Sequence, residues 1–520
     1  MIPFSLFGLG SFSLVRADVT LPAMISEHAV LQRDAKVAIW GKADAGEAVT
    51  VEFRTQKKTA TADKNGAWSV TLEPLTAGGP DVLTVTGKNT VTVPDLLVGE
   101  VWICSGQSNM ERPVQSSLDS DLEALSANDS QIRLMQVPHS ARSEPFRDAA
   151  LKWTPCSPES VANFSAIGYY YGKQLRASLN VPVGLIECAW GGTRAEAWAR
   201  TESLQGDEVL RPIVDQWTQK CHNFDVKKAE DEYLQRVKEW DELAEKAKAE
   251  NKPIPPKPTK AEDPRFDKHH PGNLFNGMVA PLAPYSFRGV IWHQGESNTA
   301  RAYQYRRLLP VLIKDWRGLW KAGDFPFYIV QLANHHEIQT APGDSEWAEL
   351  REAQWLTARA LPKVEVICST DLGAAKEMLP KDKQAVGRRL ARVALNDLYG
   401  MPGKIVRCGP QFKSSKLVGE KFVIEFEHPY NGPLNSLTSW YNEPLRGFAI
   451  AGKDREWKWA TVKIVGDTIE VWHPEIPEPA AVRYNWADNP QGNLYNGAYL
   501  PAYPFRTDDW DAVTRENTIP

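Results

Sequence analysis

The chain has 520 residues, too many for one ordinary hydrophobic core, so two to four domains are expected. Its 60 basic and 65 acidic side chains give a formal net charge of -5, without the positive excess typical of proteins that bind nucleic acid or anionic membranes. We therefore expect small or neutral molecules as partners, and no nucleic acid.

Residues 1–17 have the pattern of a signal peptide. The stretch is apolar, and Ala17 is a small residue where a signal peptidase would cut, although the usual basic segment is missing. We expect a secreted or periplasmic protein. No later segment has the roughly 20 uninterrupted apolar residues of a membrane span, so no membrane contact is expected after signal removal. The six cysteines are not spaced as a zinc site, and neither a metal nor a cofactor is predicted.

Residues 18–97 predict an N-terminal β-sandwich domain. Short segments of alternating apolar residues are separated by Gly, Asp and Asn turns, and each should be a strand that buries one face. These segments are 36–41, 49–53, 68–72 and 82–87.

Residues 98–408 change to near-continuous apolar strands that alternate with helical stretches. This pattern predicts a parallel sheet covered by helices on both faces, with the active site at the carboxyl ends of the strands. The expected strands are 98–104, 183–188, 289–293, 327–331 and 364–368. A charged helical and Pro-rich insertion at about 220–268 reads as a solvated face with a stiff connector. From 409 to 520 the β pattern returns and predicts a C-terminal β-rich domain.

The first strand of this α/β region runs into an unusual turn, "VWICSGQSNME" at 101–111. Ser108 stands where the strand stops and a helix should begin, so that the N–H groups around it are unpaired and favour negative charge. A serine hydroxyl there can attack a carbonyl while its own N–H holds the resulting oxyanion. A plain N-cap serine is the alternative.

Two further strand ends carry similar turns. Gly191 and Gly192 follow the second strand, and Gln294 and Asn298 follow the third, beside Gly295. Glycine allows close approach of a backbone N–H to a ligand. Three polar, glycine-containing turns at one edge of a sheet indicate a site rather than packing alone.

These turns resemble successive blocks of the sialate O-acetylesterase family, within the SGNH hydrolase superfamily, over nearly all of residues 19–510. The matching blocks are "GQSNM" at 106–110, "WGGTRAEAW" at 190–198, "NGMVAPL" at 276–282, "GVIWHQGESN" at 289–298 and "ELREAQ" at 349–354. The resemblance implies an SGNH-type three-layer α/β/α sandwich flanked by N-terminal and C-terminal β-sandwich-like regions. It also implies removal of acetyl groups from sugar hydroxyls through an acyl-serine intermediate, without a metal.

Site roles follow from the same resemblance. Ser108 resembles the nucleophile. Its N–H, that of Gly192 and a side-chain amide resemble the oxyanion hole, with Gln294 preferred over Asn298 for the amide. Glu296 is a candidate substrate contact, expected either to orient the loop through hydrogen bonds or to be a structural carboxylate.

The general base is where the chain departs from the family. The family has a histidine in an Asp-x-Gly…Ile-His-Pro-x-x-Lys segment. Residues 371–389 align with that segment without a gap, and Leu379 occupies the histidine position. Asp371 is retained, but an aspartate without an imidazole completes no triad. Leucine cannot transfer a proton, so catalysis is expected to use a substitute base or to be badly impaired.

Several residues are candidates for a substitute general base or for substrate contacts, each with an alternative role. His293 is either a substitute base or a wall residue of the site, and His335 and His336 are either sugar contacts or an exposed loop pair. Gln107 and Asn109 flank the nucleophile. Further candidates are Trp190, which could stack on a sugar or pack in the core, and Arg194, which could bind a sugar acid or form a surface salt bridge.

Two functions are carried forward from these residues. The leading hypothesis is a carbohydrate O-acetylesterase that acts on an acetylated sugar. The alternative is a carbohydrate-binding pseudoenzyme that retains the pocket without turnover.

Overall fold

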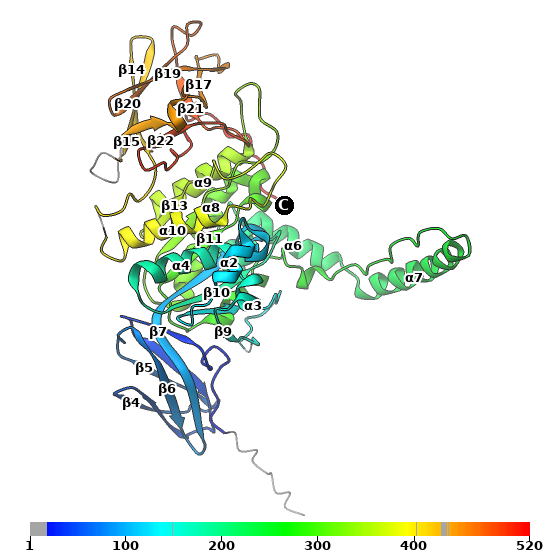
Figure 1. Cartoon of the computed structure of the whole chain (residues 1–520). Helices are drawn as coiled ribbons and strands as arrows, with labels where there is room; N and C mark the ends of the chain where they lie inside the picture. The colour runs from blue at the N-terminus through cyan, green and yellow to red at the C-terminus, as the bar shows by residue number, and fades with distance from the viewer. Residues whose placement is uncertain (1–17, 148, 402, 428–433, 435, 520) are drawn as a thin grey trace, which may run out of the picture.

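The computed structural model describes residues 18–147, 149–401, 403–427, 434 and 436–519, so the predicted signal peptide lies outside the described residues. Three regions follow one another along the long axis of the molecule: an N-terminal β region, a central α/β region and a C-terminal β region (Figure 1). None of the helices in these described ranges combines the length and hydrophobicity that a bilayer crossing requires. All six cysteines are described, and they form no disulfide.

The N-terminal region consists of two antiparallel sheets, as the sequence predicts. β2 (Val37–Lys42) pairs with β5 (Ala67–Leu72). The other sheet contains β3 (Ala48–Phe53), β4 (Gln56–Thr61) and β6 (Gly78–Thr86). In β3 the alternate residues Val49, Val51 and Phe53 are buried, which is why this segment is a strand with one covered face.

A single long strand, β7 (Thr90–Gly106), joins the first two regions. Its first half pairs with β6, and its second half pairs with strands of the central sheet. β1 (Val30–Gln32) adds a parallel partner to its middle. The boundary expected between residues 97 and 98 therefore lies inside a strand, and one hydrophobic cluster extends from Val49 to Ile103 and beyond.

The central sheet runs in the order β13, β12, β11, β7, β10, β8, β9, and only the edge strand β9 is antiparallel. The remaining strands are β8 (Ile132–Gln136), β9 (Trp153–Pro155), β10 (Val183–Ala189), β11 (Gly289–His293), β12 (Phe327–Val330) and β13 (Val364–Ile367).

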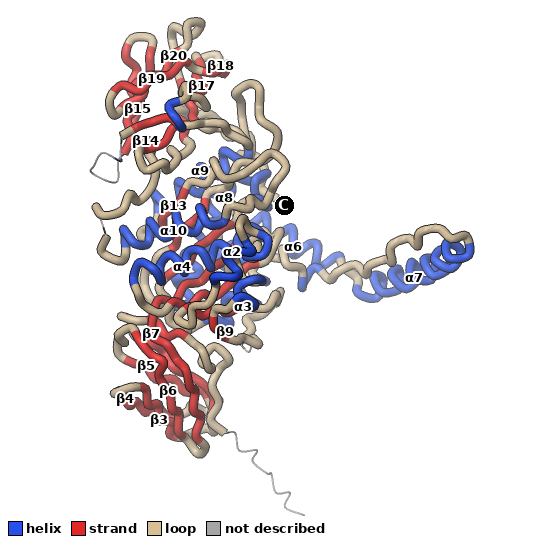
Figure 2. Tube along the Cα trace, in the orientation of Figure 1, coloured by secondary structure: helices blue, strands red, loops and turns tan. Residues whose placement is uncertain are grey.

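Helices cover both faces of this sheet. α4 (Ala166–Leu179) and α10 (Lys383–Asp397) pack on one face, and α8 (Ala302–Trp320) and α9 (Glu346–Ala360) on the other (Figure 2). Trp102 and Cys104 of β7 belong to the hydrophobic cluster of the first face, whereas Val101 and Ile103 belong to that of the second. The predicted three-layer α/β/α sandwich is therefore confirmed. Short helices lie between these elements: α2 (Ser120–Ser126), α3 (Pro158–Ala162) and α5 (Thr201–Gln205).

The charged insertion forms a long arm, defined here as residues 224–266, that projects from the body beyond α6 (Arg211–Asn223) (Figures 1 and 2). Its helix α7 (Val226–Ala249) is largely exposed, and Ala229 and Ala244 are its buried residues. The Pro-rich segment returns beside the helix, where the indole N–H of Trp240 donates to the carbonyl of Pro255 at 2.7 Å.

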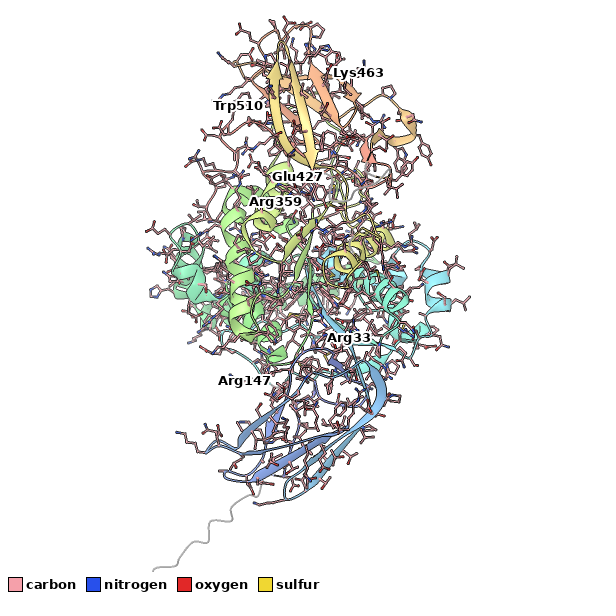
Figure 3. All side chains as sticks on the ribbon, turned by 90° about the vertical axis from the view of Figure 1, so that its left-hand side faces the viewer. Arg33, Arg147, Arg359, Glu427, Lys463 and Trp510 are labelled. Atoms are coloured by element: carbon pink, nitrogen blue, oxygen red, sulfur yellow. The ribbon has the colours of Figure 1, made fainter. Side chains whose placement is uncertain are left out.

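The C-terminal region has its own hydrophobic core. One antiparallel sheet contains β14 (Gln411–Val418), β15 (Lys421–Glu427), β20 (Thr468–Trp472) and β19 (Thr461–Val465). The others contain β18 (Trp457–Trp459), β17 (Phe448–Ala451), β21 (Ala481–Tyr484) and β23 (Phe505–Arg506), and β16 (Leu437–Ser439) with β22 (Leu494–Asn496). Arg359 of α9 forms an ion pair with Glu427 of β15 at 3.3 Å across the junction with the α/β region (Figure 3).

Candidate active site

Three neighbouring strands of the central sheet end at the same level. Gly106 of β7 pairs with Ala189 of β10 on one side and with His293 of β11 on the other. After β7 the chain first builds the β8–β10 side of the sheet and then the β11–β13 side, so β7 lies at the point where the strand order reverses. Open α/β sheets bind their ligands at such a point. The predicted meeting of the three polar turns at one sheet edge is confirmed.

Ser108 begins the short helix α1 (Ser108–Glu111) directly after this strand end. A Cβ on Gly106 would lie 2.1 Å from the carbonyl oxygen of His293, so only glycine permits the strands to approach so closely. No side chain caps the start of α1. Ser108 is half-buried, and its hydroxyl has no hydrogen-bond partner among the described residues. The hydroxyl is therefore free to meet a ligand.

The Gly191–Gly192 turn lies against this serine. A Cβ on Gly191 would lie 3.4 Å from Cβ of Ser108, and the N–H of Gly191 donates to Oε2 of Glu111 at 2.6 Å. Gly192 is exposed and has a φ of 71°, which favours glycine. Within the described part of the chain the N–H of Gly192 has no acceptor. The N–H groups of Ser108 and Gly192 are thus both open, and Gly192 directly follows the glycine that packs against Ser108.

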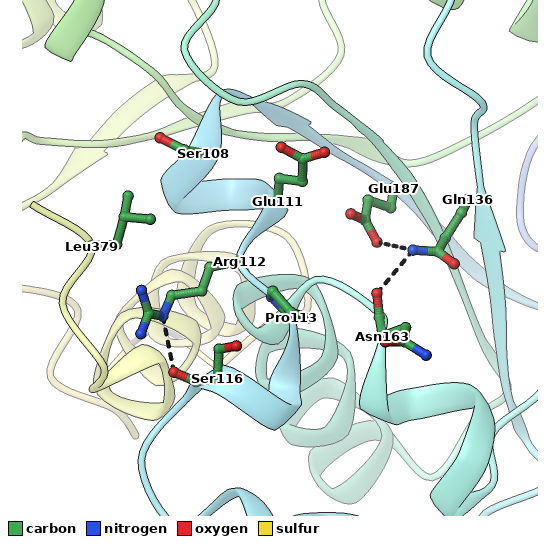
Figure 4. Close-up of a pocket in the computed structure, with 9 residues that line it drawn as sticks. All are labelled: Ser108, Glu111, Arg112, Pro113, Ser116, Gln136, Asn163, Glu187 and Leu379. Carbon is green, nitrogen blue, oxygen red and sulfur yellow. Dashed lines mark hydrogen bonds between the residues drawn. The ribbon is translucent and has the colours of Figure 1, made fainter. Parts of the chain in front are cut away.

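Ser108 opens into a cavity of about 440 Å³, called the serine cavity below (Figure 4). Leu379 lines the same cavity, and the side chains of the two residues lie on the same side of it in Figure 4. The residue expected at the family's histidine position therefore lies at the serine cavity and presents a branched alkyl group. Other lining residues are Glu111, Arg112, Gln136 and Glu187.

The carboxylate of Asp371 binds an arginine and orients no histidine. Both carboxylate oxygens of Asp371 accept hydrogen bonds from Arg389, at 2.6 Å each. The hydroxyl of Tyr495 lies 3.5 Å from one of these oxygens. Asp371 does not line the serine cavity, so its carboxylate joins the loop to α10 and to the C-terminal region.

His293 is a buried wall residue in this structure. It is 1% exposed, and both of its ring nitrogens lack hydrogen-bond partners among the described residues. Burial lowers the pKa of His293 well below its usual value, so the ring is neutral. His293 does not line the serine cavity, and this geometry does not support the role of substitute base.

The paired histidines lie elsewhere. His336 lines a separate cavity together with Trp347 and Asp488. His335 packs on the same tryptophan, and its Nδ1 lies 3.4 Å from the carbonyl oxygen of Ala374. Neither histidine lines the serine cavity, so the geometry does not support a contact of this pair with a sugar bound there.

The side-chain amides expected in the oxyanion hole are already engaged. Nε2 of Gln294 donates to Oδ1 of Asn298 at 2.7 Å and to the carbonyl of Thr193 at 3.2 Å. Nδ2 of Asn298 donates to Oε2 of Glu196 at 2.9 Å. Both amides are buried, and they join the turn after β11 to the turn after β10. The geometry does not support either amide as an oxyanion donor, and it leaves the backbone N–H groups of Ser108 and Gly192.

Three of the expected substrate contacts face the protein interior. Oε1 of Gln107 lies 3.4 Å from the backbone N of Gly295. Asn109 donates from Nδ2 to Oε1 of Glu296 at 2.5 Å and accepts from Nζ of Lys383 at 2.6 Å. Burial raises the pKa of Glu296 and lowers the pKa of Lys383 to about 7. These side chains stabilise the turn behind Ser108 and do not line the serine cavity.

Glu111, which lines the serine cavity, pairs with an imidazole that the sequence pattern did not indicate. Nε2 of His139 lies 2.8 Å from Oε1 of Glu111, and the imidazole stacks on the indole of Trp190 with centroids 4.3 Å apart. Glu111 could have been noticed because residues three apart share a helix face. His139 could not, since it lies in a connecting loop without a pattern around it. The expected contact Arg194 is half-buried, and its guanidinium has no hydrogen-bond or ion-pair partner among the described residues.

Glu187 is a second unpredicted carboxyl in the serine cavity. Its Oε2 accepts from the backbone N–H of Ser165 at 2.8 Å and from Nε2 of Gln136 at 3.1 Å. Burial raises the pKa of Glu187 to about 8, so the cavity contains a carboxyl that is largely protonated at neutral pH.

The parallel sheet, its two helical layers and the serine turn at the central strand define an SGNH-like α/β fold of the hydrolase class. The chain also matches the model of the family described as carbohydrate esterase, sialic acid-specific acetylesterase, over residues 98–242 and 266–396. It therefore belongs to the sialic acid-specific acetylesterase family of carbohydrate esterases. The unmatched residues 243–265 lie in the arm.

Known relatives agree with this assignment. The crystal structure of a novel carbohydrate acetylesterase from Xanthomonas citri is 34% identical, has a TM-score of 0.78, and aligns over 95% of this chain and 100% of that chain. The sialate O-acetylesterase of Mus musculus is 26% identical over 92% of this chain and 93% of its own length. That of Homo sapiens is 27% identical over 78% and 75%, respectively.

Proposed function

We propose that this protein hydrolyses acetyl esters on sugar hydroxyls and that Ser108 is the nucleophile. The observation that carries the proposal is the free hydroxyl of Ser108, which opens into a cavity and lies against the Gly191–Gly192 turn with its open N–H. Membership of a carbohydrate esterase family supports the reaction class.

The reaction would proceed in two displacements. Oγ of Ser108 forms a bond to the acetyl carbon, and its proton passes to a base. The N–H groups of Ser108 and Gly192 hold the oxyanion until the bond to the sugar oxygen breaks and that oxygen takes up a proton. Water then attacks the acetyl-serine, releases acetate and restores the hydroxyl.

The Glu111–His139 pair supplies the base in this proposal. Leu379 cannot accept a proton, and the described alternatives His293, His335 and His336 do not line the serine cavity. His139 does not line this cavity either, but its partner Glu111 does, and Glu111 lies one helical turn from Ser108. The pair holds segment 190–191 from two sides, because Glu111 binds the N–H of Gly191 and His139 stacks on Trp190. A carboxylate that orients an imidazole is the arrangement a serine hydrolase requires.

Leu379 favours a second candidate function. A protein that keeps the cavity and lacks the family base could bind acetylated carbohydrates without turning them over. The fold is the same for both candidates, so the distinction has to come from acetate release.

The deciding experiment measures acetate release from 4-nitrophenyl acetate and from acetylated xylo-oligosaccharides. Release that is lost in Ser108→Ala, with the folded state retained by circular dichroism, supports the esterase. Saturable oligosaccharide binding without Ser108-dependent release supports the pseudoenzyme and contradicts catalysis.

We also propose that the protein is secreted or periplasmic. The apolar residues 1–17 with the small Ala17 support export. N-terminal sequencing of the protein recovered outside the cytoplasm should give a chain that starts near Asp18. An intact residue 1 on protein that stays with the cytoplasmic fraction would contradict the proposal.

A further inference from the structure

A second cavity lies at the base of the arm and is called the arm cavity below. Its volume is about 750 Å³, larger than that of the serine cavity. Both roots of the arm contribute to it: Phe224 and Val226, the first residue of α7, on one side, and residues 260–263 with Phe266 on the other. The body contributes Trp190, Lys268 and His269.

The arm cavity and the serine cavity lie on either side of one short segment of chain. Trp190 lines the arm cavity, and the next residue, Gly191, packs against Cβ of Ser108. Nζ of Lys268, in the arm cavity, donates to the carbonyl of Gly191 at 3.0 Å and would lie 3.8 Å from a Cβ on Gly192. A carbohydrate chain with one acetylated ring at Ser108 can therefore extend neighbouring rings toward the arm.

The apolar lining of the arm cavity suits sugar rings. Phe266 is 59% exposed, so its ring does not serve the core of the protein. Phe224 is half-buried and lines the same cavity. Aromatic faces in a concave site pack against the C–H faces of sugars, while nearby polar groups bind the hydroxyls.

The charges of the arm cavity favour neutral sugars over acidic ones. The lining carries two lysines against three carboxylates; these are Lys260, Lys268, Glu262, Asp263 and Asp267. Burial lowers the pKa of His269, so this ring adds no charge at neutral pH. Lys260 pairs with Glu230, and Lys268 donates to the carbonyl of Gly191, so neither lysine of the lining is left free for the carboxylate of a sugar acid.

We propose that the arm cavity is a subsite for the neutral sugar rings of the carbohydrate whose acetyl group reaches Ser108. This inference rests on the proposed function and names its substrate class. The arm then has a role that its charged sequence alone does not indicate: its two roots form one wall of the subsite, on the opposite side of segment 190–192 from the nucleophile.

The test separates binding from catalysis by using the Ser108→Ala protein, which cannot form the acyl intermediate. Isothermal titration with acetylated xylohexaose should give saturable binding, and Phe266→Ala in the same background should weaken it by about fivefold or more, as expected for loss of one aromatic contact. Leu234→Ala is the matched control, since Leu234 is 55% exposed on α7 and does not line the cavity. An acetylated galacturonan oligosaccharide should bind more weakly than the xylohexaose.

Equal affinity of the Phe266→Ala and parent proteins would overturn the subsite, and so would preference for the acidic oligosaccharide or absence of saturable binding by either. Hydrolysis of 4-nitrophenyl acetate by the protein with Ser108 intact reports on the proposed function separately. Ser108-dependent hydrolysis without any effect of Phe266→Ala on oligosaccharide binding would leave the esterase standing and remove the subsite. The reverse pattern would retain the subsite in a protein that only binds carbohydrate.

Discussion

Ser108 and Leu379 line the same cavity, so a leucine side chain shares the cavity with the serine at the position where the resemblance implies a histidine. The cavity contains the nucleophile expected of an esterase. The proposed base is a pair: Glu111, which lines the cavity, and His139, which comes from a distant loop and does not line it.

Leu379→His should raise Ser108-dependent hydrolysis of 4-nitrophenyl acetate by about 10²-fold, because a positioned imidazole contributes this much as a general base. The measurement is kcat/KM. Leu379→Asn is the control, since it introduces polarity of similar size without a base. No rise with histidine, or an equal rise with asparagine, would mean that the alignment of residues 371–389 or the mechanism is wrong.

Asp371→Asn should change the rate of the Leu379 protein by less than about twofold, because an aspartate without an imidazole to orient takes no part in proton transfer. Its carboxylate binds Arg389 instead. In the Leu379→His background the same substitution should remove most of the gain. Additive effects of the two substitutions on kcat would contradict this coupling.

His139→Gln should lower kcat for aryl acetate hydrolysis by about 10²-fold, with a smaller change in KM, because the imidazole is assigned to proton transfer and not to binding. Glu111→Gln should also lower kcat, since it removes the charge that orients the ring. His222→Gln, at an exposed position on α6, is the control and should leave both constants unchanged. If His139→Gln keeps the parent kcat, the base lies elsewhere.

Glu187→Gln should make the stability less dependent on pH. The pKa of Glu187 is raised by burial from 4.5 to about 8, so the folded protein keeps its proton in this window while the unfolded chain releases it. The contribution of Glu187 to the free energy of unfolding therefore falls as pH rises from 4.5 to about 8.

A glutamine retains an oxygen for the donors Ser165 and Gln136 and does not titrate. Relative to the parent, the variant should gain on the order of 3 kcal/mol between about pH 5 and pH 8. Urea unfolding at both pH values measures it. A constant difference between the two proteins would contradict the raised pKa.

Local patterns in the sequence were sufficient for the fold and for the position of the serine. Alternation in β3 and the apolar runs of β7, β10 and β11 predict their burial directly. Because parallel strands end at one sheet edge, the three glycine turns were expected to meet, and they do. The sequence could not show that one strand crosses the expected domain boundary at residues 97 and 98. A strand that changes its pairing partners in the middle keeps the same pattern of apolar residues throughout.

The roles of individual polar side chains could not be predicted from local sequence patterns. Gln294, Asn298 and Asn109 have the composition expected of ligand contacts, but packing gives each of them a partner within the protein. A buried amide must satisfy its hydrogen bonds, and which groups come within reach depends on how distant segments pack.

The sequence by itself determined the layered α/β sheet, the exposed serine turn and the absence of the family base, because strand periodicity, turn chemistry and residue identity are local properties. The tertiary structure decided that Glu111 meets His139, that Asp371 binds Arg389 and that the roots of the arm enclose a second cavity. These contacts join segments that are far apart along the chain, so their geometry is set by the packing of the whole sheet, its helices and the arm.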